Sequence, residues 1–204
     1  MGLPNCSFDP TAPLTLDASV AINLNATGSI ERILDALPNS VVVLDVVKRE
    51  LEAGRAKGRT DADMIAALVK SGRIQLVSLS QECEGNFLAM VSGSAASTLD
   101  DGEAATIAWS VAHGGIPVVD EKKGQAICRD RFPAILACTT TDILAHEHVR
   151  AALGEADLAD AIFSALRIAR MRVPDCHLDW VVQQIGQSRA SICTSLPLSV
   201  RGGP

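Results

Sequence analysis

The chain has 204 residues, enough for one globular domain whose core needs no disulfide or structural metal. Hydrophobic residues make up 48% of it and aromatic residues only 3%, which is typical of a parallel sheet covered by Ala-rich helices. The formal net charge of −6 argues against a protein that grips long nucleic acids through a broad basic face, although it leaves open a nucleic-acid enzyme with a carboxylate active site.

The six cysteines include no Cys-x-x-Cys pair. We interpret them as reduced thiols that fill the core of a cytoplasmic protein. Residues 1–13 lack the basic and apolar regions of a signal peptide, and no apolar run approaches the roughly 18 residues of a membrane span. The sequence therefore predicts a soluble protein without a membrane partner.

In the first half of the chain, short apolar runs alternate with amphipathic stretches, which predicts strands alternating with helices. Strands are expected over Leu14–Ser19, Val41–Asp45 and Arg73–Leu79. Helices are expected over Ala18–Leu24, over Ser29–Leu37 with a Ser N-cap, from Val46 to the terminating Gly58, over Asp61–Val69, and in the first part of Ser80–Thr98.

The second half continues this alternation. Asp101–His113 has an acidic first turn and ends at Gly114-Gly115, so it is expected to be a helix. Strands are expected over Ile116–Asp120 and Ala134–Thr139, and further helices over Glu121–Phe132, Asp142–Leu153, Ala156–Arg170 and Asp175–Gly186.

This order of elements predicts an α/β fold, a three-layer α/β/α sandwich around a mostly parallel sheet of about five strands. We expect residues 1–13 to form a flexible arm and residues 14–153 the main domain. Residues 154–187 are then helices packed on the same domain, and the Ser/Pro/Gly-rich residues 188–204 a loose tail.

Four acids occur where a sheet edge could bring them together. Asp17 and Asp120 end two apolar strands, Glu50 lies in the helix after the second strand, and Glu103 lies in the first turn of the Asp101 helix. Each has an ordinary explanation on its own, as a helix cap, a solvated ion-pair partner or a charge that complements a helix dipole.

Considered together, these acids point to a metal site. The carboxyl ends of parallel strands meet at one edge of a sheet, and carboxylates that converge there repel one another unless cations hold them. Oxygen ligands suit Mg²⁺ or Mn²⁺ rather than zinc, and such sites support metal-assisted hydrolysis of phosphodiesters. Asp101 is a further candidate ligand.

Three segments, LDASVAINL, VVLDVVKREL and LDDGEAATIAWSVAHGGIPVVDEKK, resemble in this order and spacing the PIN-domain family of ribonucleases. The resemblance covers about Leu14 to Leu153. It is closest to the subgroup whose third acid begins a Gly-Glu-Ala helix. Two positions depart from the common pattern, Ala18 where many relatives have Thr and Glu103 where many have Asp.

The resemblance implies a PIN-like nuclease domain in which Asp17, Glu50, Glu103 and Asp120 are the catalytic and metal-binding acids. It places Ser19 near the scissile phosphate. The implied activity is a Mg²⁺- or Mn²⁺-dependent endoribonuclease with RNA as substrate. Because many family members are toxins, a small antitoxin protein is a possible partner, and the Ala-rich helices from Ala156 onward offer a homodimer face.

Other groups carry weaker signals. Lys122 and Lys123 are either phosphate contacts or the solvated start of a helix. The basic strip near Arg170 is interpreted as a solvated face, and His146 and His148 have the wrong spacing to share a helix face. Neither a Gly-rich phosphate loop nor a Gly-x-Ser-x-Gly elbow is present.

Two alternative functions remain open at this stage. The first is a non-catalytic PIN-like binding or scaffold module that keeps the acids without turnover. The second is a receiver-like signalling domain, which should carry a Lys after its fifth strand, where this chain has Thr139 to Asp142.

Overall fold

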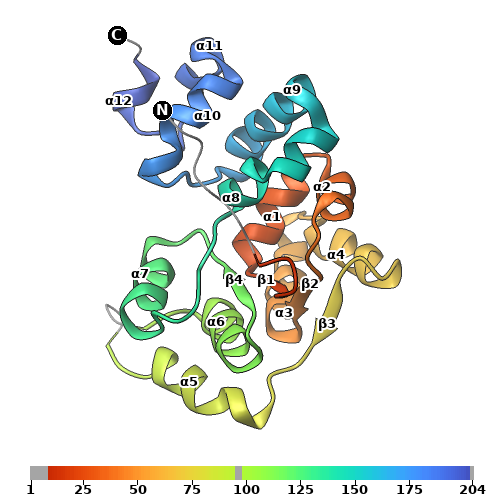
Figure 1. Cartoon of the computed structure of the whole chain (residues 1–204), viewed down its shortest axis with the longest axis vertical. Coiled ribbons are helices and arrows are strands. Elements are labelled where there is room, and N and C mark those ends of the chain that lie inside the picture. Colours follow the sequence, from red (N-terminus) through yellow and green to blue (C-terminus); the bar gives the residue numbers. More distant parts are fainter. Residues whose placement is uncertain (1–8, 95–97, 203–204) are drawn as a thin grey trace. The chain divides into compact units, whose positions relative to one another are not determined.

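The computed structural model describes residues 9–94 and 98–202. The chain divides into two compact units, which are considered separately (Figure 1). The sheet unit comprises residues 9–21 and 38–138, and the helical unit comprises residues 22–37 and those from 139 onward. This division does not coincide with the boundary at residue 153 expected from the sequence. Helix α1 (Ala18–Ala26) runs from the first unit into the second.

The sheet unit contains β1 (Leu14–Leu16), β2 (Val41–Leu44), α3 (Asp45–Ala53), the 3₁₀ turn η1 (Gly54–Lys57), α4 (Asp61–Lys70), β3 (Gln75–Val77), α5 (Gln81–Val91), α6 (Asp101–His113), β4 (Ile116–Val118) and α7 (Lys122–Arg131). Every helix and strand expected before residue 133 is present. Strand 1 ends earlier than expected, because Ala18 and Ser19 already belong to α1.

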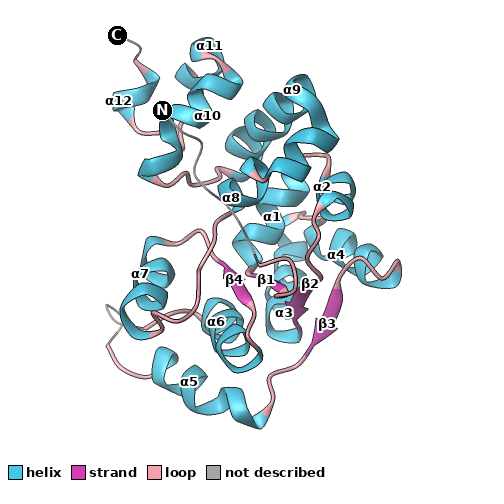
Figure 2. Ribbon diagram, in the orientation of Figure 1, coloured by secondary structure: helices cyan, strands magenta, loops and turns pink. Residues whose placement is uncertain are grey.

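The four strands that the described residues form make a parallel sheet in the order β3-β2-β1-β4, flanked by helices (Figure 2). All residues of β1, β2 and β4 are buried, as expected for strands of a parallel sheet that helices cover. Helix α6 packs against β1, β2 and β4, and α3 packs against α6. The successive strands β1, β2 and β3 build the sheet in one direction, whereas β4 joins the opposite side of β1.

The fifth strand expected over Ala134–Thr139 is wrong. Only Cys138 pairs with β4, through a single parallel bridge to Val118. Its amide donates to the carbonyl of Pro117, and its carbonyl accepts from the amide of Val119, both at 2.9 Å. Continuing this ladder toward Leu136 would require an N–H from Pro117, which proline lacks. Leu136 accordingly lies 58% exposed outside the sheet.

The helical unit contains α2 (Ile30–Ala36), α8 (Thr140–Ala145), α9 (Glu147–Ser164), the π-helical turn η2 (Ala165–Ala169), the 3₁₀ turn η3 (Asp175–His177), α10 (Leu178–Ile185), α11 (Gln187–Ser191) and α12 (Leu198–Arg201). Helix α9 packs against α2, α8 and α10. Its Gly154, at φ 74°, interrupts the helical backbone between the two helices that the sequence predicted there.

The single helix expected over Asp142–Leu153 is two helices, α8 and α9, separated at His146. The backbone of His146 is extended, at φ −58° and ψ 135°. Its ring Nδ1 accepts a 3.3 Å hydrogen bond from the amide of His148, so the imidazole caps the start of α9. The apolar periodicity that predicted one helix does not register a cap made by a His side chain.

Parts of the predicted arm and of the predicted tail lie within the described residues. In the first arm, the Asn39 side chain donates to the carbonyls of Asp9 and Ala12 at 2.7 and 2.8 Å. Residues 1–8 of that predicted arm lie outside the described residues. The predicted tail contains α11 and α12, and Cys193 between them is fully buried.

The cysteines agree with their interpretation as core residues. Of those described, Cys83, Cys128, Cys138 and Cys193 are buried free thiols, and Cys176 is an exposed one. Among the described residues, none of the helices is both long and apolar enough to cross a membrane.

Candidate active site

The candidate site lies at the carboxyl edge of the sheet, where β1 and β4 are neighbours. The order of strands reverses at this pair, and open α/β sheets generally bind ligands beyond the carboxyl ends of the strands at such a point. The amide of Asp17 donates to the carbonyl of Val118 at 3.2 Å, which joins the two strand ends. Asp17 and Asp120 follow these strands and are both buried.

The two carboxylate oxygens of Asp17 face different neighbours. Oδ2 accepts from the hydroxyl of Ser19 at 2.7 Å and from the amide of Ser19 at 3.2 Å, at the start of α1. Oδ1 faces the start of α6, where it lies 3.6 Å from the position that a Cβ on Gly102 would occupy. Burial raises the pKa of Asp17, as does the charge of Asp100, while the Ser19 hydrogen bonds oppose the rise.

Glu50 reaches the same place from α3. The residue is exposed as a whole, but its Oε2 lies only 2.5 Å from the Cβ position of Gly102. A side chain at this position would displace the carboxylate, so the glycine provides the space for it. Burial of the carboxyl group raises the pKa of Glu50 to about 7, together with the negative charges of Asp17, Asp100 and Asp101.

Glu103 lies in the first turn of α6 and is only 4% exposed. Within residues 9–94 and 98–202 its Oε1 has no hydrogen-bond partner, and a Cβ on Gly124 of α7 would collide with this carboxylate. The pKa of Glu103 is raised to about 8, chiefly by burial. The negative charges of Asp17, Asp100 and Glu121 add to this rise, and the positive charge of Lys123 opposes it.

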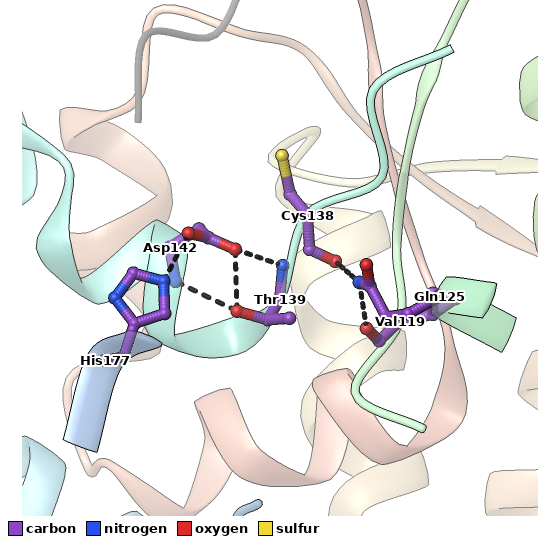
Figure 3. A network of polar contacts seen from close by, with 6 residues as sticks. All are labelled: Val119, Gln125, Cys138, Thr139, Asp142 and His177. Atoms are coloured by element: carbon purple, nitrogen blue, oxygen red, sulfur yellow. Dashed lines mark hydrogen bonds and ion pairs between the residues drawn. The ribbon is translucent and has the colours of Figure 1, made fainter. Parts of the chain in front are cut away.

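Asp120 is held near the site through the backbone that precedes it. The side-chain amide of Gln125, in α7, donates to the carbonyls of Val119 and Cys138 at 2.8 and 3.0 Å (Figure 3). These two hydrogen bonds connect Val119, which follows β4, to Cys138, which pairs with β4. Gln125 therefore fixes the backbone at the residue immediately before Asp120.

The remaining predicted residues have identified positions. Ser19 is half-buried and bound to Asp17. Lys122 is exposed at the start of α7, and the ammonium group of Lys123 donates to the carbonyl of Thr98. The structure thus brings Asp17, Glu50 and Glu103 together around the start of α6.

Sequence reasoning missed three contributors to this arrangement. Asp100 is the N-cap of α6, and its Oδ1 accepts from the amide of Glu103 at 2.9 Å. Its position directly before an acidic helix start was a readable N-cap signal. Gly102 and Gly124 make room for carboxylates, and no local pattern reveals that role because the acids come from other elements.

The donor set determines which ligand these residues fit. Converging carboxylates with raised pKa values, and a buried carboxylate oxygen without a partner, are the surroundings that a hard cation would neutralise. Within the described residues, no three His, Cys, Asp or Glu side chains are already grouped so as to hold a metal ion. Asp17, Glu50, Glu103 and Asp120 therefore stay predicted ligands.

Comparison with known proteins identifies the family. A family model described as a PIN domain matches residues 14–187. No curated protein and no solved structure matches the chain. The match covers most of the sequence and includes both β1 and β4, with the acids that follow them. The chain therefore belongs to the PIN-domain family.

Proposed function

We propose that this protein is a divalent-metal-dependent endoribonuclease that hydrolyses RNA phosphodiester bonds. PIN domains are generally metal-dependent nucleases, which supports the reaction class. The observation that carries the proposal is the group of like charges at the start of α6, where Asp17, Glu50 and Glu103 all have raised pKa values. Buried carboxylates that repel one another in this way are costly for the fold, and such groups cluster at sites that serve a ligand.

Asp17, Glu50, Glu103 and Asp120 are the residues that would hold Mg²⁺ or Mn²⁺, since their oxygen donors suit a hard cation. A bound ion would supply an activated water and neutralise the charge of the scissile phosphate. Asp17 keeps Oδ1 free of the Ser19 hydrogen bonds, which use Oδ2. In the metal-free protein, burial and like charges raise the pKa values of Glu50 and Glu103 to about 7 and about 8, and a bound cation would favour their charged forms.

The cationic residues of α7 have separate roles in this proposal. Lys123 donates to the carbonyl of Thr98 and lowers the pKa of Glu103, so we assign it to balancing charge in the site. Lys122 is exposed, and we assign it to contact with an RNA phosphate. Ser19, beside Asp17, is the hydroxyl nearest to the substrate in this assignment.

The test is RNA cleavage by purified protein, using a mixed pool of labelled RNAs with Mn²⁺ or with EDTA. We expect cleavage that requires Mn²⁺ and falls by about a thousandfold or more in Asp17→Asn and in Asp120→Asn. The control is Asp130→Asn, which removes one exposed carboxylate paired with Arg129 in the same unit. Cleavage that EDTA does not reduce, or that Asp17→Asn retains, would refute the mechanism.

A non-catalytic binding or scaffold module is the second candidate. One observation favours it, because the described acids are not already grouped to hold an ion. Titration of the wild-type protein with Mn²⁺ by calorimetry, run alongside the cleavage assay, separates the two. Binding of Mn²⁺ without cleavage of any RNA would favour the scaffold, whereas binding with cleavage favours the nuclease.

We further propose, within this function, that the chain belongs to the Gly-Glu-Ala subgroup of the family and acts as the toxin of a toxin–antitoxin pair. The LDDGEAA segment supports the subgroup, and the family match supports the PIN-domain family to which that subgroup belongs. A small antitoxin protein and a second copy of this chain would be its partners, in the cytoplasm. A neighbouring gene that encodes a small DNA-binding protein would support the pairing.

A further inference from the structure

Asp100 is an acid that the four-acid pattern does not include. It precedes α6 and is exposed. Its Oδ1 accepts a 2.9 Å hydrogen bond from the amide of Glu103, which is the N-cap interaction of this helix. Asp100 therefore holds the helical turn from which Glu103 projects.

The same turn is where the other acids converge. The Cβ position of Gly102 lies 2.5 Å from Oε2 of Glu50 and 3.6 Å from Oδ1 of Asp17. The negative charge of Asp100 raises the pKa values of Asp17, Glu50 and Glu103, whereas that of Asp101 raises the pKa of Glu50. Asp100 is thus within electrostatic reach of the whole set.

A second observation indicates that this turn faces a ligand. Glu103 is only 4% exposed, and its Oε1 has no hydrogen-bond partner among the residues that the structure describes. Asp100 bonds the backbone of Glu103 and leaves that oxygen available. A cation bound by Glu103 would be attracted by a nearby Asp100 charge whether or not Asp100 touched it.

We propose that Asp100 is a positioning residue of the metal site with two separable effects: its hydrogen bond places Glu103, and its charge strengthens cation binding from outside the ligand set. This inference rests on the proposed function, because it concerns the same site. It adds a residue that raises the affinity for the metal without being one of the four predicted ligands.

Asn and Ala at this position separate the two effects. Asn is as good an N-cap as Asp, so Asp100→Asn keeps the hydrogen bond to Glu103 and removes only the charge. Asp100→Ala removes both. Asp130→Asn controls for the change of one unit in net charge, since Asp130 is exposed and paired with Arg129.

The experiment measures the Kd of Mn²⁺ by calorimetry and the melting temperature of metal-free protein, at low and high salt. We expect Asp100→Asn to weaken Mn²⁺ binding by about three- to tenfold at low salt, and less at high salt because Asp100 is exposed to screening ions. Its melting temperature should not fall. Asp100→Ala should lose affinity and also melt earlier, while Asp130→Asn should bind as the wild type does.

The outcomes distinguish this inference from the function on which it rests. If wild-type protein binds Mn²⁺, Asp17→Asn does not, and Asp100→Asn binds as the wild type does, the role of the Asp100 charge is refuted while the site stands. A loss of affinity in Asp100→Asn that is independent of salt would also refute it. If the wild type binds no Mn²⁺, the proposed function and this inference fail together.

Discussion

Two acids of this chain occupy the same position of a helix and have opposite surroundings. Asp142 is the third residue of α8, and Glu103 is the third residue of α6. In the helical unit, Asp142 Oδ2 accepts from the amide and hydroxyl of Thr139 at 2.8 and 2.7 Å, and Oδ1 contacts Nε2 of His177 at 2.6 Å (Figure 3). In the sheet unit, Oε1 of Glu103 is buried with no partner.

The difference in hydrogen-bond partners indicates what each acid does. Thr139 and Asp142 form a capping box, in which the acid at the third position returns to the N-cap backbone and stabilises the helix start. In α6 the N-cap is itself an acid, Asp100, so a capping box would bring two carboxylates together. Glu103 is instead withheld from the cap. A satisfied acid serves the fold, and an unsatisfied one is available to a ligand.

The largest effect is expected at Glu103. Glu103→Gln should reduce Mn²⁺-dependent RNA cleavage by about a thousandfold, because it removes a predicted metal ligand. The free energy of unfolding of the metal-free protein should fall by no more than about 0.5 kcal/mol, since the substitution also relieves repulsion from Asp17 and Asp100. Cleavage assays and urea unfolding in EDTA measure the two effects. A large loss of stability would mean that Glu103 serves the fold, as Asp142 does.

At Asp142 the expected effect is on stability. Asp142→Ala should lower the free energy of unfolding by about 3 kcal/mol, because Thr139 loses its cap partner and His177, only 2% exposed, loses the partner of Nε2. The control is Asp157→Ala, which breaks an exposed ion pair with Arg32 in the same unit and should cost under about 1 kcal/mol. Equal losses in the two variants, measured by urea unfolding, would contradict the comparison.

The third prediction concerns the dependence of stability on pH. In the folded, metal-free protein the pKa values of Glu50 and Glu103 are raised from 4.5 to about 7 and about 8, chiefly by burial. Between pH 4.5 and about 8 the folded state binds more protons than the unfolded state. The free energy of unfolding should therefore decrease as pH rises from 4.5 to about 8. Urea unfolding in EDTA at several pH values tests this. Glu103→Gln should flatten the trend, and a rise of stability with pH would contradict it.

Much of the fold was predictable from local patterns. The bounds of α6 match the prediction, because an acidic first turn and a following Gly-Gly mark its two ends. The four strands were also predicted, as apolar runs between turn residues. The fifth strand could not be judged from its own residues. It would have to pair with β4, where Pro117, far from it in sequence, has no N–H to donate.

For the candidate site, the sequence predicted where two of the acids lie, whereas their role stays a prediction. Asp17 and Asp120 follow buried strands, and pairing of β1 with β4 brings the ends of these strands together. The parts that sequence reasoning missed are the charge of Asp100 on three other acids and the space that Gly102 and Gly124 leave for carboxylates. None of these is visible as a spacing or a period.

The sequence by itself determined most of the helices, the strands that form the sheet and the family, because periodicity, caps and motif order are carried by neighbouring residues. Only the tertiary structure decided which acids lie close together and which have hydrogen-bond partners. The physical reason is that burial and charge interactions depend on distance in space, so two acids at the same helical position, Glu103 and Asp142, acquire opposite roles from residues far away in the chain.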